Sequence, residues 1–251
     1  MGRPEDGFGA PFILMQCIEG GHFADRFPKS PREDLGPLQA FAALFRRLHT
    51  LDWRPYSTDA DQIDLPGNPY FHFDQRLKLF SGYLASAGLT VFDPVLDWLK
   101  AQRARVPCHK SSVVHFDFHA DNILEDADGQ LYVVDWSSAG ISDYRFDLGW
   151  SLALALAYGG AVRREMILDA YQRQVGRPVP ELAVFEVAAF LQRIALVMIS
   201  LAVGAEKLGM RPAASEAMRR DREPLTRLYQ RMVLLTGLTV PEVAAWLDSL
   251  G

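Results

Sequence analysis

Apolar residues recur at helical spacing over most of the chain. Between residues 38 and 51 they fall three or four positions apart, as on one face of an amphipathic helix. Pro180 and Pro241 stand at predicted helix starts, whereas Pro224 is expected to kink or split a helix. The same spacing predicts further helices over residues 72–86, 93–103, 147–158, 161–175, 180–208, 213–235 and 241–250.

Short apolar runs interrupt the helical pattern and predict strands. These runs are residues 10–20 (APFILMQCIEG), 111–115 (SSVVH), 122–126 (NILED) and 131–136 (LYVVDW). Turn-forming residues join the last two runs, and a polar cluster over 115–122 is thereby expected in a loop. The sequence therefore predicts an α+β fold that is mainly α.

The longest apolar segment, residues 182–205, is the only candidate for a membrane span in the sequence. Glu186 and Arg193 lie inside it, and charged side chains are costly in the core of a bilayer. We therefore expect a buried helix here and no membrane partner.

Composition narrows the classes of function. The 251 residues are 49% hydrophobic, which allows a substantial core, and the formal net charge is −5. Because acidic and basic residues are interspersed, no nucleic-acid partner is predicted. The two cysteines, Cys17 and Cys108, lie far apart without metal-ligand spacing, and no signal peptide is recognisable. These features predict a cytoplasmic location.

The loop between the predicted strands carries the candidate chemistry. Asp117 is a candidate general base, because an aimed carboxylate can accept the proton of a substrate hydroxyl. Asn122 and Asp135 are candidate ligands of Mg²⁺, which prefers oxygen donors alongside the oxygens of a phosphate chain. Taken singly, each of them is compatible with a turn, and Asp143 with a helix N-cap. Their spacing and the flanking apolar strands together favour a functional site.

A different metal chemistry is an alternative for the same loop. Histidine and aspartate alternate over residues 115–121, which is compatible with a His/Asp metal-dependent hydrolase. Such a site needs further ligands, and the remaining histidines, at positions 22, 49, 72 and 109, are isolated in sequence. Tightly bound zinc, manganese or iron would favour the hydrolase, whereas Mg²⁺-dependent nucleotide binding would favour a kinase.

The loop resembles the catalytic loop of kinases, H-R-D-x-x-x-x-N followed by a later aspartate. It is more similar to that of the aminoglycoside phosphotransferase and choline kinase-like family, which reads H-G-D-x-H-x-x-N and then I-D-W. The matching stretches here are HFDFHADN (115–122) and VDW (134–136). Residues 139–150 (AGISDYRFDLGW) resemble the family's G-D-P-x-x-D-L segment, and residues 44–53 resemble its helix ending in L-H-x-x-D. Phe116 replaces the family's glycine, and Ala120-Asp121 replaces its Pro-Gly pair.

This resemblance implies a protein-kinase-like C-terminal lobe, with a hinge strand and a short-stranded catalytic loop region at residues 113–136. The implied activity is transfer of the γ-phosphoryl group of ATP to a hydroxyl of a small molecule, with ATP and Mg²⁺ as cofactors. The implied catalytic base is Asp117, and the implied magnesium ligands are Asn122 and Asp135. The other implied site residues are His115 and Asp147, as supports of the loop, and Gln16, Cys17 and Ile18, whose backbone groups would meet the adenine.

The resemblance covers only the C-terminal lobe of that family. About ten residues precede the hinge-like run, and the first lysine, Lys29, follows it, so the family's upstream phosphate-binding lysine has no counterpart. We expect residues 1–20 to be a remnant of the N-terminal lobe with its hinge strand, and residues 21–251 to be a helical C-terminal lobe. Three explanations remain open: a start further upstream, a lobe supplied by another chain, or a non-catalytic pseudokinase-like binding module.

The acceptor and the oligomeric state are left open by the sequence. Acceptors in the family include aminoglycosides, choline-like amines and other small alcohols, and the motif does not choose among them. Acidic residues near the loop, Asp121, Glu125 and Asp126, give a weak preference for a cationic acceptor. An uncovered apolar edge over residues 11–17 predicts self-association.

Overall fold

The computed structural model describes residues 14–57, 63, 65–208, 210, 213–220 and 222–250. Its helices are α1 (Gly36–Thr50), α2 (Phe71–Ser86), α3 (Asp93–Ala101), α4 (Tyr144–Val175), α5 (Leu182–Val203), α6 (Ala214–Arg220), α7 (Arg222–Thr236) and α8 (Pro241–Asp248). Its strands are β1 (Gly20–His22), β2 (Ser112–Val114), β3 (Ile123–Asp126), β4 (Leu131–Val133) and β5 (Gly140–Ser142). The predicted class, α+β and mainly helical, is confirmed.

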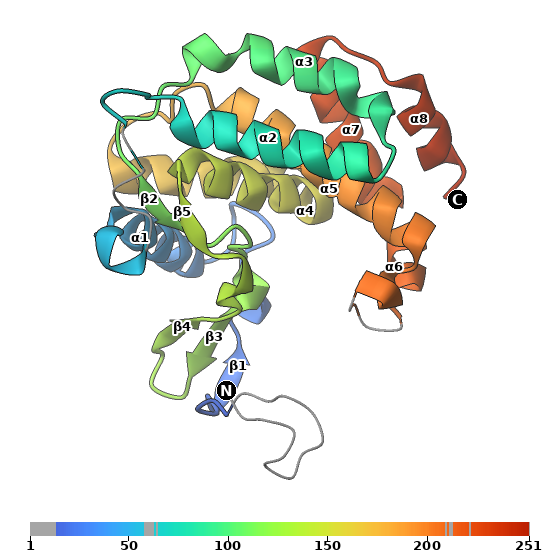
Figure 1. Ribbon diagram of the computed structural model, residues 1–251. Helices are drawn as coiled ribbons and strands as arrows, with labels where there is room; N and C mark the ends of the chain where they lie inside the picture. Colours follow the sequence, from blue (N-terminus) through green and yellow to red (C-terminus); the bar gives the residue numbers. More distant parts are fainter. Residues whose placement is uncertain are drawn as a thin grey trace, which may run out of the picture.

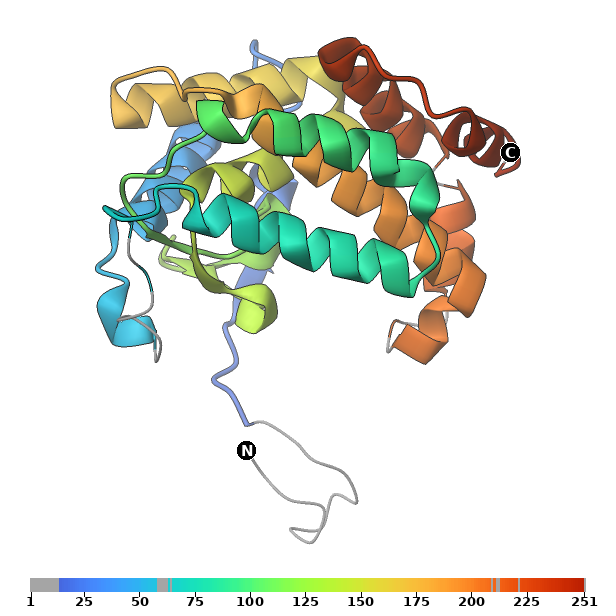
Figure 2. The same cartoon turned by 45° about the horizontal axis from the view of Figure 1, so that its top comes forward.

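The helices form one body, and a small antiparallel sheet projects from it (Figure 1). Helix α4 contacts α1, α5 and α7, so it is the central element of the body. Helices α2 and α3 lie next to each other across one face, which is seen most directly in the turned view (Figure 2). The projecting sheet has the strand order β1-β3-β4, whereas β2 and β5 pair separately beside α1 and α4.

Two hydrophobic clusters lie on the two sides of α4. The larger cluster joins α4 to α2, α3, α5, α7 and α8, and its fully buried side chains include Phe92, Phe185 and Phe190. The smaller cluster joins α4 to α1 and to the strands around the candidate loop, and it includes Phe41 and Phe45. Because both clusters share α4, the loop residues that contact this helix are fixed to the main core.

Helices α4 and α5 approach each other closely at Gly149. A Cβ atom added there would lie 2.8 Å from the backbone oxygen of Phe185, so only glycine fits without a shift of backbone. Further along α4, the guanidinium of Arg164 donates two hydrogen bonds of 2.7 Å to the buried carboxylate of Glu186 on α5. Backbone contact and a buried ion pair therefore set the position of α5.

Two features of α4 and one of the region of α6 and α7 agree with the sequence analysis. The Asp143 side chain accepts a hydrogen bond of 3.0 Å from the Arg145 backbone N–H, so Asp143 is the N-cap. The helix is interrupted at Gly160, where φ is +73°, between the two predicted segments 147–158 and 161–175. The helix predicted over 213–235 is split into α6 and α7, and Pro224 lies in the first turn of α7, where proline is tolerated.

The strand predicted over residues 10–20 is wrong for the part that the structure describes. Residues 10–13 lie outside the described residues, and residues 14–19 have no regular secondary structure. The strand begins instead at Gly20, whose missing side chain is required because a Cβ atom would lie 1.8 Å from the backbone oxygen of Glu125. The apolar run therefore did not predict the position of the strand, because pairing with β3 depends on a glycine rather than on β-branched residues.

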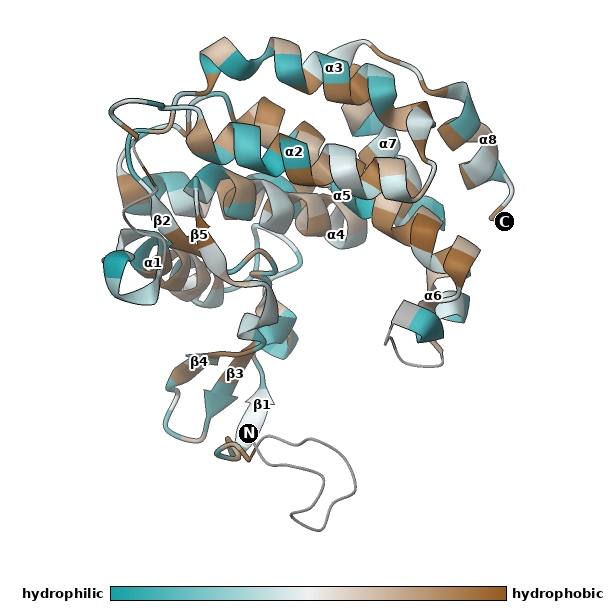
Figure 3. Cartoon of the chain, viewed as in Figure 1, coloured by the Kyte–Doolittle hydropathy of each residue, from teal (hydrophilic) through white to brown (hydrophobic). Residues whose placement is uncertain are grey.

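Helix α5 has the length and hydropathy of a membrane span, but 72% of its most apolar window is buried inside the structure. The apolar character of its C-terminal part is visible as brown ribbon in Figure 3. This burial is the pattern of a core helix, as the charges within the segment predicted.

Candidate active site

The candidate loop is framed by two antiparallel strand pairs. Strand β2 pairs with β5, which the sequence analysis did not predict, so that Val114 lies opposite Gly140. Strand β3 pairs with β4, with Ile123 opposite Val133. The segment between β2 and β3 is therefore held at both ends, and the chain bends at Phe116, where φ is +60°. This left-handed conformation explains why a glycine suits the corresponding position of the motif.

Asp147 holds the backbone of the loop. Its carboxylate is fully buried and accepts hydrogen bonds from the backbone N–H of His115, at 2.7 Å, and of Phe116, at 2.9 Å. His49 of α1 adds a third contact, because its Nε2 lies 3.2 Å from Asp147 Oδ2 while its Nδ1 lies 2.8 Å from the hydroxyl of Tyr171. One carboxylate thus ties the start of the loop to both α4 and α1.

Phe118 anchors the middle of the loop in the core. Its ring is stacked on Phe45 with centroids 4.2 Å apart and planes 6° apart, and its side chain is 1% exposed. Its backbone oxygen also accepts a hydrogen bond of 2.6 Å from the Ser151 hydroxyl. Because residue 118 points inward, the side chains on either side of it, Asp117 and His119, are directed away from the core.

Asp117 is held as a carboxylate. Trp150 Nε1 donates a hydrogen bond of 2.9 Å to its Oδ1, and His119 Nε2 lies 3.5 Å from the same oxygen. Burial alone would raise the pKa of Asp117, but the hydrogen bonds from His119 and Trp150 and the nearby histidines lower it overall. The group is therefore ionised at neutral pH.

His119 lies between two carboxylates. Its other ring nitrogen, Nδ1, is 3.4 Å from Asp121 Oδ2. Burial alone would lower the pKa of His119, but Asp117 and Asp121 together raise it above its ordinary value. A protonated His119 offsets part of the negative charge around Asp117.

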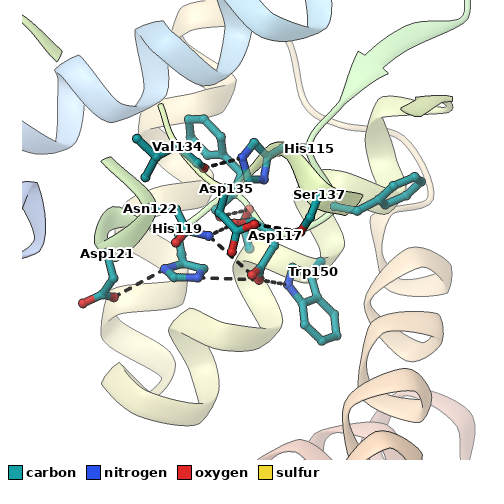
Figure 4. A network of polar contacts seen from close by, with 12 residues as sticks. His115, Asp117, His119, Asp121, Asn122, Val134, Asp135, Ser137 and Trp150 are labelled. Carbon is teal, nitrogen blue, oxygen red and sulfur yellow. Dashed lines mark hydrogen bonds and ion pairs between the residues drawn. The ribbon is translucent and has the colours of Figure 1, made fainter. Parts of the chain in front are cut away.

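The structure brings Asn122 and Asp135 to the same place as Asp117. Asn122 Nδ2 donates to the backbone oxygen of Asp117, at 2.9 Å, and lies 3.3 Å from its Oδ2. The backbone oxygen of Asn122 accepts from the N–H of Val134, at 2.9 Å, which places Asp135 directly beyond that contact. Figure 4 shows the three polar side chains projecting into one region.

His115 braces the strand that leads to Asp135. Its side chain is fully buried, and its Nε2 donates a hydrogen bond of 2.9 Å to the backbone oxygen of Val134. Its ring also packs 4.9 Å from the Trp136 ring. The ring is therefore directed at the backbone before Asp135 and not into the group of carboxylates (Figure 4).

An open cavity of about 510 Å³ lies beside this group. Asp117, His119 and Asp121 are part of its wall, and the floor and sides come from α1, α4 and α5. A cavity of this size accommodates a small organic molecule.

Gln16, Cys17 and Ile18 are not part of the polar network. Gln16 and Cys17 are exposed and Ile18 is half-buried, in the stretch without regular structure before β1. The following strand pairs with β3, and His22 Nδ1 lies 3.3 Å from the backbone oxygen of Asp121. The chain after this stretch therefore reaches the end of the candidate loop, and the predicted adenine contacts stay a prediction.

The donor atoms around Asp117 fit a hard cation. Asn122 uses its amide nitrogen toward Asp117, which leaves its carbonyl oxygen for another partner. Asp135 accepts from the Ser137 hydroxyl through Oδ1, at 2.7 Å, and among the described residues no donor reaches its Oδ2. One carboxylate oxygen and one amide oxygen are ligands that Mg²⁺ accepts together with phosphate oxygens. Within the described parts of the chain, no three His, Cys, Asp or Glu side chains are arranged to hold a metal ion by themselves.

Three residues that shape the site were missed by the sequence analysis as site residues: Trp150, His49 and Phe118. Trp150 and His49 lie inside the two segments that resemble family motifs, so their place in those motifs was the available signal. Phe118 alternates with the polar residues of the loop, and that alternation indicates an inward-facing anchor.

The chain is similar to a known family in sequence and to solved structures in fold. The sequence pattern of the "Phosphotransferase enzyme family" matches residues 1–191 of the chain. No curated protein matches it.

Solved structures show the same fold at low sequence identity. A protein from Ralstonia eutropha JMP134, provisionally assigned as an aminoglycoside phosphotransferase, superposes with a TM-score of 0.56 at 15% identity, over 81% of this chain and 68% of that one. A Plasmodium vivax ethanolamine kinase gives 0.51 at 9% identity, over 88% of this chain and 63% of that one. An aminoglycoside-3′-phosphotransferase of type VIII gives 0.50 at 21% identity, over 69% of this chain and 66% of that one. The chain thus spans about two thirds of the length of these kinase-like proteins.

Proposed function

Because the chain belongs to the phosphotransferase enzyme family, we propose that it transfers the γ-phosphoryl group of ATP to a hydroxyl of a small molecule. The observation that carries this proposal is the ionised carboxylate of Asp117 in the wall of an open cavity, with Asn122 and Asp135 beside it. The proposed general base, the proposed metal ligands and a cavity for the acceptor are then adjacent.

Asp117 is the proposed catalytic base. The hydroxyl oxygen of the acceptor forms a bond to the γ-phosphorus while the bond to the β-phosphate oxygen breaks and ADP leaves. The hydroxyl proton passes to the Asp117 carboxylate, which Trp150 and His119 hold in its ionised form. Asp147 and His115 act indirectly: Asp147 positions the loop, and His115 positions the strand before Asp135.

Asn122 and Asp135 are the proposed ligands of Mg²⁺, through the oxygens that have no described donor. When bound there, Mg²⁺ would supply positive charge against the negative charge that develops on the transferred phosphoryl group. Backbone groups of Gln16, Cys17 and Ile18 are the proposed contacts of the adenine, in a hinge segment before the helical lobe. A cytoplasmic location is proposed because Cys17 and Cys108 are both free thiols, which suits a reducing compartment.

The proposal is tested by separating turnover from nucleotide binding. Asp117→Asn keeps the shape of the side chain but removes the base, so we expect turnover of any accepted alcohol to fall by about a hundredfold or more. Affinity for Mg²⁺ and a non-hydrolysable ATP analogue should be retained. The measurement is ADP release with a panel of small alcohols, beside calorimetric titration of the analogue.

Asp128→Asn is the matched control, because Asp128 is an exposed acid in the β3–β4 turn. It should leave both readouts unchanged. Equal turnover by the wild-type chain and Asp117→Asn would refute Asp117 as the base. Nucleotide binding without turnover by the wild type would instead indicate a non-catalytic binding module.

A further inference from the structure

The cavity beside Asp117 has a second polar region, on α4 and α5. Arg163, Gln192 and Arg193 contribute to the wall there. The rest of the wall is mainly apolar, with contributions from Phe41, Trp150, Leu154, Ile167 and Leu196. The cavity therefore offers polar contacts at two places and an apolar surface elsewhere.

Arg163 is held at the cavity without an anionic partner. Its Nε atom is buried and has no hydrogen-bond partner, and among the described residues no carboxylate pairs with it. The neighbouring Arg164 differs, because Glu186 binds it through two hydrogen bonds of 2.7 Å. Arg163 as a whole is half-buried, but a buried N–H without an acceptor is costly, so a ligand that supplies an acceptor there is favoured.

The position of Arg163 is built into the break in α4. Its side chain folds over Gly159, where an added Cβ atom would lie 2.3 Å from Arg163 Cδ. The next residue, Gly160, has a φ of +73° and redirects the helix. Gly159 therefore makes room for this side chain, and the break at Gly160 sets the direction of the helical segment that carries it.

The other polar groups of this region present hydrogen-bond donors. Arg193 donates a hydrogen bond of 2.6 Å to the Tyr158 hydroxyl, which also lines the cavity. The amide oxygen of Gln192 accepts a hydrogen bond of 2.7 Å from Arg76, so the polar group that remains on Gln192 is its NH₂ donor. Two guanidinium groups and an amide donor form a region suited to a carboxylate or phosphate.

The acidic residues near the loop are engaged by groups other than Arg163. Asp117 and Asp121 share His119, whose pKa they raise. Glu125 pairs with Arg26, and Asp126 accepts hydrogen bonds from within its own hairpin. The preference for a cationic acceptor that these acids suggested in the sequence is therefore not favoured by the cavity.

We propose that the acceptor is an anionic alcohol, in which an apolar body separates the hydroxyl from a carboxylate or a phosphate that Arg163 and Arg193 bind. This proposal rests on the proposed function, since the hydroxyl is assigned to the Asp117 region. It excludes aminoglycosides and choline-like amines as preferred acceptors, because a cation in the cavity would face the Arg163 guanidinium, which has no anionic partner among the described residues.

The test compares four probes that differ only in the group distant from the hydroxyl. The probes are 6-hydroxyhexanoate, 6-hydroxyhexyl phosphate, 6-hydroxyhexanamide and 6-amino-1-hexanol, titrated into the full chain by calorimetry. At least one anionic probe should bind about tenfold more tightly than the amide, and the amine should bind more weakly than the amide. Whichever anionic probe binds more tightly identifies the source of the negative charge as carboxylate or phosphate.

Substitutions of the two arginines test whether these side chains cause the preference for an anionic probe. Arg163→Gln should remove most of the preference for the anionic probe without changing affinity for the amide or for the nucleotide. Arg173→Gln is the matched control, because Arg173 lies on the same helix but is 72% exposed and outside the cavity. Circular dichroism checks folding, and Arg193→Gln serves as the second variant if Arg163→Gln does not fold.

Several results would overturn the inference. These are equal affinity for acid and amide, tighter binding of the amine, no binding of any probe, or a preference that survives in both arginine variants. Measurement of ADP release with the same probes separates a failure of this inference from a failure of the proposed function. Anion-selective binding without transfer would contradict the proposed function alone, whereas transfer to the amine but not to the anionic probes would contradict this inference alone.

Discussion

At the scale of single residues, the site depends on how one carboxylate is kept ionised in a half-buried position. Asp117 loses water on one side, which favours its neutral form, and it regains stabilisation from Trp150 and His119. The lowered pKa is therefore the sum of opposing effects, and removal of either donor should change it in a known direction.

Trp150→Phe removes one hydrogen bond to Asp117 and keeps most of the apolar ring. The pKa of Asp117 should rise toward its ordinary value, because burial then opposes ionisation with less compensation. Since the proposed base works only when ionised, the acidic limb of the profile of kcat/KM against pH should move to higher pH. The pH–rate profile of the variant with the best acceptor is the measurement.

Trp98→Phe, on α3, is the control for loss of an indole elsewhere in the molecule. Its acidic limb should stay in place. An unchanged limb in Trp150→Phe would mean that the hydrogen bond from Trp150 does not control the ionisation of the base.

The grouping of Asp117, Asn122 and Asp135 was predictable at this scale, because their intervals in sequence place them around one loop and the strand that follows it (Figure 4). Their roles as base and metal ligands stay a proposal. Arg163 was not predictable, since its place at the cavity depends on the break at Gly160 and on how α4 packs, and no short sequence interval records either.

At the scale of elements, α4 connects the candidate site to the core. It carries Asp147 and Trp150 near its start, packs on α5 at Gly149 and breaks at Gly160 before Arg163. The geometry of the loop and the cavity is therefore sensitive to the spacing between α4 and α5.

Gly149→Ala tests this close approach. Alanine favours the helix by about 0.5–1 kcal/mol, but its Cβ atom would lie 2.8 Å from the backbone oxygen of Phe185. We expect a net destabilisation of about 1–3 kcal/mol, because neither helix backbone can shift without disturbing the packing around it. Chemical denaturation measures the change in the free energy of unfolding.

Gly82→Ala, within α2, is the matched control. No atom lies within 4 Å of the added Cβ, so this substitution should stabilise the protein by up to about 1 kcal/mol. Destabilisation of similar size in both variants would contradict the account of the α4–α5 contact.

The long helices were predictable because their apolar spacing extends over many residues. The short strands were less predictable. Strands β2, β3 and β4 were recognised near the loop and its turn, whereas β5 was missed and β1 was placed too early in the sequence. Strands of three residues depend on a partner that is distant in sequence, and the glycines of β1 give no apolar signal.

At the scale of the whole molecule, an exposed apolar segment leads into the small sheet. Leu14 is 91% exposed and Met15 is 78% exposed, next to the stretch predicted to contact the adenine. Large apolar side chains exposed together favour contact with another surface.

We therefore predict that the chain self-associates at high concentration. The double variant Leu14→Ser, Met15→Ser should reduce this association, whereas Leu234→Ser, at an isolated side chain that is 71% exposed, should not. Light scattering over a range of concentrations is the measurement. A wild-type chain that stays monomeric at high concentration would contradict the prediction.

The central claim is that Asn122 and Asp135 hold Mg²⁺ for a nucleotide beside Asp117, and calorimetric titration of a non-hydrolysable ATP analogue, with and without Mg²⁺, tests it most directly. The account predicts binding by the wild-type chain that requires Mg²⁺, a loss of about tenfold or more in Asp135→Asn, and unchanged binding in Asp128→Asn. Binding that is the same with and without Mg²⁺, or that Asp135→Asn leaves intact, would contradict it.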